Sequence, residues 1–184
     1  LGMKHVFNFW DVVPSTTNMA NTVPYFNNIK AVPGALPYIE EISYHRYGGV
    51  SDANLQSIAS LAQQYGLKTS MLEWWNTSNT YKILHKDLKM GLNSAWEQGG
   101  LAGPKNVDPN KNPTTSLYLI DGLTDPSHPI IEIHPKTKYF RQYYKFIRPG
   151  AVRIEATSTD ANHDPLAFIN KDGNIVERRI KKEL

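Results

Sequence analysis

Cysteine is absent from the sequence of 184 residues, which excludes disulfide bonds, thiolate metal ligands and a cysteine nucleophile. The sequence also lacks a run of about eighteen apolar residues, so we expect no helix that spans a membrane. Net charge is small, because 20 Lys and Arg residues oppose 17 Asp and Glu residues. A formal charge of +3 over this length is no signature of nucleic-acid binding, and we expect no nucleic-acid partner.

Phosphate-binding glycine motifs are missing as well. Neither GxGxxG nor GxxxxGK[ST] occurs, although an open parallel sheet that binds a nucleotide usually carries such a turn after its first strand. Hydrophobic residues make up 40% of the chain and charged residues 20%, which is typical of a folded globular protein.

Strand patterns alternate with helical patterns along most of the chain. The clearest helix is capped by Ser51 or Asp52 and ended by Gly66. A weaker helical segment, 18–29, contains Pro24, so any helix there should be short or begin near that proline. The other expected helices are 81–92 and 138–147, the latter with Tyr139, Tyr143, Phe146 and Ile147 on one side, and the expected strands are 6–10, 38–45, 67–75 and 94–96.

The second half of the chain is less regular. Residues 99–115 are rich in Gly, Pro and Asn and should form a loop. Segment 116–120 is strand-like, and the pattern leaves open whether it is a hairpin within that loop or a strand of the main sheet. Further strands are expected at 152–157 and 166–170, followed by a hairpin turn at Asp172-Gly173 and a return strand from Ile175.

Alternation of strands and helices predicts an α/β fold with parallel strands joined by crossover helices. An open doubly wound sheet and a (β/α)8 barrel both fit this order. The missing glycine motif favours the barrel, in which the chemistry is carried by residues at the carboxyl ends of the strands.

Unusual side chains gather at those expected strand ends. Aromatic faces suit the C–H faces of sugar rings, while carboxylates and histidine bind sugar hydroxyls. The alternative interpretations are a surface or ion-paired glutamate, a structural histidine and tryptophans that belong to the core. The candidate catalytic residue is Glu73, and the candidate substrate-binding residues are His45, Tyr47, Trp10, Asp11, Trp74, Trp75 and Trp96.

Four motifs resemble glycoside hydrolase family 30, in family order, from about residue 5 to about residue 177. The most specific is FIRPG at residues 146–150, which resembles the end of the last barrel helix in that family. The segment LAFINKDG at 166–173 is similar to a strand and hairpin of the family's side β-domain. ISYHRYG at 42–48 and MLEW at 71–74 resemble the ends of the sixth and seventh barrel strands.

The resemblance implies a fold and a domain division. Residues 1–150 would form the C-terminal half of a (β/α)8 TIM barrel, strands five to eight, as a partial catalytic domain. Residues 151–184 would begin the side β-domain. A barrel of this kind takes about 250 residues and must close on itself. We therefore expect the chain to be a piece of a longer protein, with the N-terminal part of the barrel supplied by the same or another chain.

The resemblance also implies a retaining β-glycosidase, a hydrolase of carbohydrate metabolism. Glu73 would be the nucleophile, and a second Glu would act as general acid and then general base, with the two carboxyl groups about 5–5.5 Å apart. Neither step needs a metal or another cofactor. The family's acid/base Glu follows an Asn on the fourth strand, and no Asn-Glu pair occurs in this chain. As given, the chain would lack that residue and be inactive alone.

Two other functions remain open from the sequence. A carbohydrate-binding relative could keep the aromatic cleft without the chemistry. A polyanion-binding module could use the basic segment 178–182, although its residues are more typical of a solvated edge. Family members act on glucosylceramide, xylan and other β-linked glycans, so the resemblance implies a carbohydrate substrate and a secreted, extracellular or lysosomal location. The loop 99–115 is the expected specificity element.

Overall fold

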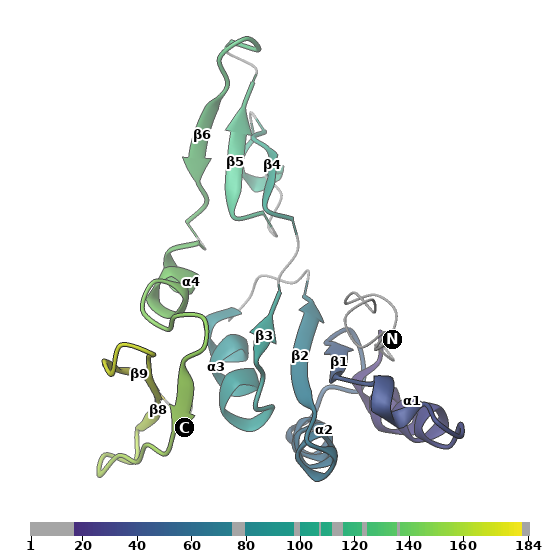
Figure 1. Cartoon of the computed structure of the whole chain (residues 1–184). Helices are drawn as coiled ribbons and strands as arrows, with labels where there is room; N and C mark the ends of the chain where they lie inside the picture. Colours follow the sequence, from purple (N-terminus) through teal and green to yellow (C-terminus); the bar gives the residue numbers. More distant parts are fainter. Residues whose placement is uncertain are drawn as a thin grey trace. The chain divides into compact units, whose positions relative to one another are not determined.

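The computed structural model describes residues 17–74, 80–97, 100–106, 108–111, 116–122, 125–135 and 137–181. The chain divides into two compact units (Figure 1), the first made of Leu1–Asn76 and Lys86–Gly99 and the second of Thr77–His85 and Gly100–Leu184. The expected strand 6–10 lies outside the described residues. The domain boundary expected at residue 150 stays a prediction.

The first unit is built on a parallel sheet of three strands. Its order is β1 (Glu41–His45), β2 (Lys68–Glu73) and β3 (Ala95–Trp96), and both neighbouring pairs run parallel (Figure 1). Helix α2 (Asp52–Tyr65) connects β1 to β2, and α3 (Thr80–Met90) lies in the chain between β2 and β3. Among the described residues, the predicted alternation of parallel strands and helices is therefore confirmed.

Alternating side chains give this sheet a buried face. Ile42, Tyr44 and Met71 are completely buried, and α2 contributes Leu55 and Ile58 to the same core. The helices that contact β1 are α2 and α1, which spans Thr22–Lys30. Residues between the buried positions of a strand point to the opposite face of the sheet. That opposite face carries the polar side chains of the candidate site.

Local signals placed most of these elements correctly. Ser51 caps α2 by accepting a hydrogen bond from the Asn54 backbone N–H, at 3.1 Å. Gly66 ends α2 in the left-handed conformation, with φ 66°. Helix α1 is short and has Pro24 in its first turn, as expected. Helix α3 ends at Met90, two residues before the expected end. Short 3-10 helices span Met19–Asn21, Leu36–Tyr38 and Pro109–Lys111.

The second unit contains two further sheets of three strands (Figure 1). In one, β5 (Tyr118–Asp121) pairs parallel with β4 (Ala102–Pro104) and antiparallel with β6 (Ile130–Ile133). The strand-like segment 116–120 therefore belongs to a separate sheet rather than to the parallel one. Strands β4 and β6 were not expected, and the first consists of Ala, Gly and Pro, which have little strand preference. The expectation of one continuous loop over 99–115 was wrong at β4.

The other sheet confirms the predicted hairpin. Strand β8 (His163–Ile169) pairs antiparallel with β7 (Val152–Ile154) and with β9 (Ile175–Lys181). Gly173 adopts φ 84° in the turn between β8 and β9, a conformation that favours glycine. Strand β9 lies at the edge of this sheet.

Helix α4 (Thr137–Tyr144) is shorter than expected, and its apolar side differs from the predicted one. Phe140 and Tyr143 are its buried residues, whereas Tyr139 is 52% exposed and lies 5.3 Å from the ring of Tyr81. The helix ends before Phe146, so the helical spacing that placed Phe146 on the buried side does not apply. No helix in the described part of the chain is long and apolar enough to cross a membrane.

The cap of α2 gives a direct stability prediction. In the full-length protein that carries this chain, Ser51→Ala should lower the free energy of unfolding by about 1 kcal/mol, because the Asn54 N–H loses its acceptor. Ser57→Ala is the matched control, since Ser57 lies within the same helix and its hydroxyl donates only to the Ala53 carbonyl. Urea unfolding measures both. Equal effects of the two substitutions would contradict the assigned cap.

Candidate active site

Glu73 and His45 are the last residues of neighbouring parallel strands. Regular pairing runs from Glu41 opposite Lys68 to Tyr44 opposite Met71, after which the register shifts and His45 pairs with Glu73. Without the shift, His45 would face Leu72 and Glu73 would point to the other face of the sheet. The irregularity therefore turns the Glu73 carboxylate toward His45, a known use of β-bulges next to functional sites.

The two side chains lie close together and remain accessible. His45 Nε2 is 3.6 Å from Glu73 Oε2. The His45 side chain is 17% exposed and that of Glu73 is 38% exposed. Because the Glu73 carboxylate is partly exposed at the end of its strand, a ligand can reach it beside the imidazole of His45.

An aromatic surface adjoins this pair. The ring of Tyr47 stacks on the ring of His45, with centroids 5.9 Å apart and planes inclined by 22°. It also stacks on Trp74, with centroids 6.1 Å apart and an angle of 27°. Tyr47 is 42% exposed, so part of the stack is open to solvent. Three rings in series next to a carboxylate form a surface on which a sugar ring could stack.

The indole N–H of Trp74 is a further feature of this surface. Its nitrogen is buried and has no hydrogen-bond partner among the described residues. Buried donors in folded proteins are nearly always paired. Water, a ligand or a protein group outside the described residues can accept this hydrogen bond.

A row of polar groups continues along the face that carries His45. Ser43 and Ser70 lie opposite each other on β1 and β2, and their hydroxyl oxygens are 2.6 Å apart. Each hydroxyl also reaches Glu41 Oε1, at 2.7 Å from Ser43 and 2.6 Å from Ser70. Glu41, Ser43 and His45 are separated by two residues each, so this strand periodicity could have revealed the row from the sequence.

Glu97 adds a carboxyl group at the end of β3. Its backbone N–H donates to the Met71 carbonyl at 2.8 Å, which continues the parallel pairing by one residue. Burial, and then the charge of Glu41, raise the pKa of Glu97 above its usual value. The sheet face that carries His45 thus combines the accessible Glu73 carboxylate with the Glu97 carboxyl group, which holds its proton more tightly than an ordinary glutamate does.

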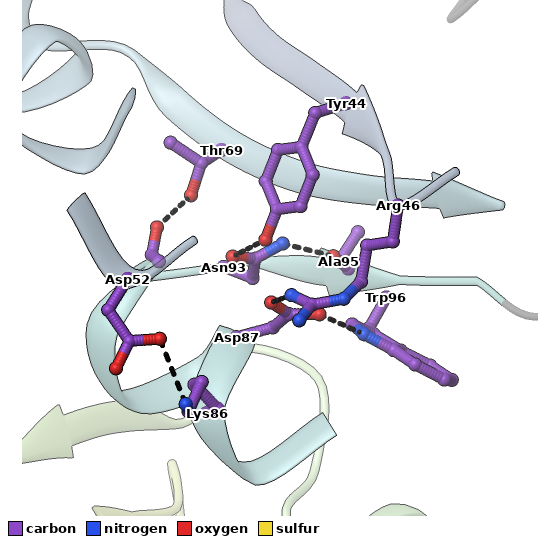
Figure 2. A network of polar contacts seen from close by, with 10 residues as sticks. Tyr44, Arg46, Asp52, Thr69, Lys86, Asp87, Asn93, Ala95 and Trp96 are labelled. Atoms are coloured by element: carbon purple, nitrogen blue, oxygen red, sulfur yellow. Dashed lines mark hydrogen bonds and ion pairs between the residues drawn. The ribbon is translucent and has the colours of Figure 1, made fainter. Parts of the chain in front are cut away.

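A buried polar network lies behind the strand ends (Figure 2). Asp87 on α3 is completely buried and forms an ion pair with Arg46, which directly follows β1. Its other oxygen accepts a hydrogen bond from the Trp96 indole N–H at 2.7 Å. Burial raises the pKa of Asp87 to about 6, although Arg46 and Trp96 act in the opposite direction.

Asn93 extends the network toward the sheet (Figure 2). Its side-chain amide is hydrogen-bonded to the Tyr44 hydroxyl at 2.9 Å, and burial raises the pKa of Tyr44 well above its usual value. Nearby, the Thr69 hydroxyl donates to the Gly91 carbonyl at 2.6 Å. These bonds fix the segment after α3 against β1 and β2. None of the network residues except Trp96 was identified from the sequence.

The structure brings together part of the predicted site. His45, Tyr47, Glu73 and Trp74 lie side by side at the ends of β1 and β2. Trp96 is 8% exposed and hydrogen-bonded to Asp87, which fits the core alternative better than a substrate contact. The remaining predicted site residues, Trp10, Asp11 and Trp75, lie outside the described residues.

The partly exposed carboxylate of this arrangement is that of Glu73. Within the described ranges, no group of three His, Asp or Glu side chains is placed to hold a metal ion. Because the Glu73 side chain is 38% exposed, its carboxylate can approach an electrophilic carbon or bind a hydroxyl, and the aromatic stack can hold an apolar ring face beside it. Both roles suit a carbohydrate ligand.

Among the comparisons with known proteins, only solved structures match the chain. No protein-family model matches the chain, and no curated protein matches it. A GH30 endoxylanase from Clostridium papyrosolvens C71 matches 91% of this chain with 21% identity and a TM-score of 0.64. SrfJ from Salmonella typhimurium matches 87% with 17% identity and a TM-score of 0.65. The catalytic domain of GH30 xylanase C from Talaromyces cellulolyticus matches 85% with 19% identity and a TM-score of 0.59.

These likenesses show that the chain has a GH30-like fold, as its motifs indicated. It spans 40%, 38% and 35% of the three matched chains, respectively. The chain thus has the mixed α/β structure of part of a GH30 catalytic domain. Its assignment to barrel strands five to eight stays a prediction.

Removing the buried cation should destabilise the full-length protein. At pH 7, Arg46→Met should lower the free energy of unfolding by about 3–5 kcal/mol, because it leaves the buried Asp87 carboxylate without its counter-charge. Lys86→Met is the control: Lys86 Nζ lies 2.9 Å from Asp52 Oδ1, but both side chains are exposed, and its loss should cost about 1 kcal/mol or less. Chemical unfolding compares them, and similar losses would contradict the assigned role of Arg46.

The raised pKa of Asp87 makes the stability loss caused by Arg46→Met depend on pH. In the native protein this pKa is about 6, above the usual 3.8, so its contribution to stability is greatest at low pH and declines as pH rises toward 6. Removing Arg46 raises the pKa of Asp87 further. The contribution of Asp87 to stability then declines at higher pH than in the native protein. The destabilisation by Arg46→Met should therefore be smaller at pH 5 than at pH 8. Unfolding at both pH values measures it, and a loss independent of pH would contradict the prediction.

Proposed function

We propose that this chain supplies the nucleophile side of a retaining β-glycosidase active site, with Glu73 as nucleophile. The observation that supports it most is the shift in strand register that brings Glu73 beside His45, next to the stacked rings of Tyr47 and Trp74. The position at the carboxyl ends of parallel strands is where (β/α)8 enzymes carry their catalytic groups.

The proposed reaction has two steps. A Glu73 oxygen attacks the anomeric carbon, the glycosidic bond breaks, and a second carboxylic acid gives its proton to the leaving oxygen. Water then attacks the glycosyl-enzyme while that same residue, now a carboxylate, takes the proton from water, which releases Glu73. His45 orients the Glu73 carboxylate, and Tyr47 and Trp74 support the sugar. The reaction needs no metal and no cofactor.

The acid/base residue of this proposal belongs to a longer protein. No Asn-Glu pair occurs in the 184 residues, and the chain spans only about two fifths of the matched endoxylanase. We propose that an N-terminal part of the barrel, in the same or another chain, supplies that residue and strands one to four. The described strands would then be the sixth to eighth.

The proposed substrate is a β-linked glycan or glycolipid. Two of the matched structures are described as an endoxylanase and a xylanase, which makes β-linked xylose polymers the first substrates to test. Secretion or a lysosomal location is part of the same proposal. A polyanion-binding role has less support, because Arg179 is paired with Glu177 and Arg178 packs over the ring of Phe146.

Substitution of the nucleophile tests the proposal. In the full-length protein, Glu73→Gln should lower kcat/KM on aryl β-glycosides and xylan by more than about a thousandfold, because the amide cannot form the glycosyl-enzyme. Glu40→Gln is the matched control: Glu40 is exposed and precedes β1, at the opposite end of the sheet, and its loss should leave the rate unchanged.

Covalent trapping provides a second readout. A 2-deoxy-2-fluoro glycoside with a good leaving group should label the protein, and peptide mapping should place the label on Glu73. Full activity of Glu73→Gln would contradict the nucleophile assignment. A native protein that binds xylan but neither cleaves glycosides nor takes up the label would instead favour the non-catalytic carbohydrate-binding relative.

The aromatic surface can be tested separately. Tyr47→Leu should weaken substrate binding by about fivefold, because a stacked ring contributes about 1 kcal/mol beyond its buried area. The effect should be mainly on KM, since Tyr47 takes no part in bond breaking. Tyr25→Leu on α1 is a control of equal chemistry, because Tyr25 is also exposed, at 52%. An unchanged KM in Tyr47→Leu would remove Tyr47 from the binding surface.

A further inference from the structure

The sheet of β4, β5 and β6 has two chemically different faces. The strand pairs place Tyr118 opposite both Ala102 and Ile133, and Ile120 opposite both Pro104 and Ile131. Side chains of directly paired residues lie on the same face of a sheet. One face, which we call the apolar face, therefore consists of Ala102, Pro104, Tyr118, Ile120, Ile131 and Ile133.

The opposite face holds the polar groups of this sheet. Lys105 Nζ lies 2.5 Å from Glu132 Oε1 and 3.5 Å from Asp121 Oδ2. Leu119, between these charges, is only 4% exposed. The polar groups thus form ion pairs on one side of the sheet, and the apolar face carries no charged residue.

The apolar face is nevertheless open in this structure. Ile131 is 67% exposed, Ile133 is 61% exposed and Ile120 is 37% exposed. A sheet of three short strands depends on burial of its apolar face for stability. Contiguous exposed apolar surface of this kind marks a contact with another protein segment. Single exposed isoleucines would need no explanation, but three neighbouring ones on a single face do.

We infer that the apolar face docks against the part of the GH30-like fold that lies outside these 184 residues. This inference rests on the proposed function, in which a longer protein completes the barrel. The chain spans only 40% of the matched endoxylanase, so such a fold has a large amount of further structure to contribute. A face without charges is typical of a permanent interface within a fold rather than of a transient one.

A second copy of this chain fits the face less well. Three strands about 4.8 Å apart and about four residues long project to roughly 200 Å², which corresponds to about 300–400 Å² of accessible surface. Stable dimers bury about 800 Å² on each partner. Packing of two such faces would therefore not hold a dimer together, whereas a covalently continuous or already associated domain needs no such area.

Cysteine labelling tests the inference, helped by the absence of native cysteine in residues 1–184. In the full-length protein, Ile131→Cys and Ile133→Cys should react with a maleimide at least about tenfold more slowly than Ile130→Cys. Ile130 is the matched control, because it is the same residue type in the same strand, is 55% exposed, and lies on the opposite face. Peptide mapping assigns each label, and all three sites should react equally in urea.

Equal native rates at the three positions would overturn the inference, because the face would then be bare. Protection that disappears on dilution would also overturn it and would identify a second copy as the occupant. A further variant, Ile131→Arg, should lower the melting temperature of the full-length protein more than Ile130→Arg does. None of these readouts depends on catalysis. An active protein with a bare apolar face would contradict the inference alone, and an inactive protein with a covered apolar face would contradict the proposed function alone.

Discussion

The candidate site depends on one buried carboxylate. Asp87 has no exposed surface, yet it binds the Arg46 guanidinium and the Trp96 indole, so a single side chain of α3 fixes the residues that follow β1 and that form β3. Burying a charge is costly unless it is paired, and its pKa of about 6 shows that burial outweighs the attraction of its partners. We interpret its role as one of positioning, because apolar residues in place of a buried ion pair often leave a protein equally or more stable.

What this network positions is the end of β1. Arg46 lies between His45 and Tyr47, and its side chain is fixed on the helical side of the sheet. Strand β1 ends at His45, and residues 46 and 47 form the bend that follows, so the ion pair of Arg46 holds this bend between the rings of His45 and Tyr47. Those two rings then meet Glu73 and Trp74 of the neighbouring strand. The register shift completes the arrangement by turning Glu73 to the same side.

The sequence predicted the elements whose signals are local. The Ser51 cap, the Gly66 end of α2 and the turn at Gly173 each depend on a few neighbouring residues, and all three were placed correctly. The parallel order of β1, β2 and β3 followed from alternation alone. Strand β4 was not predicted because its strand conformation comes from pairing with β5. The predicted end of α4 was wrong because the apolar residues Phe146 and Ile147 were placed in the helix, which ends at Tyr144.

Candidate site residues could be predicted only where they directly follow an apolar strand in the sequence. His45, Tyr47, Glu73 and Trp74 are visible as polar and aromatic residues after apolar strands. Asp87 has no such signal, because it is one charged residue among several in an ordinary amphipathic helix. The register shift is equally invisible, since Leu72 and Glu73 read as the regular continuation of the strand. The face on which Glu73 lies is therefore knowable only from the pairing.

The carboxyl groups of this face also indicate where the second catalytic residue should be sought. A general acid needs a raised pKa, and Glu97 has one, at the end of the strand next to that of Glu73. Burial is the main cause of this raised pKa, and the negative charge of Glu41 adds to it. Glu41 itself is bound by the hydroxyls of Ser43 and Ser70. Glu41 and Glu97 thus influence each other's charge on this face, while the proposed mechanism assigns the acid/base role to a residue outside the 184 residues.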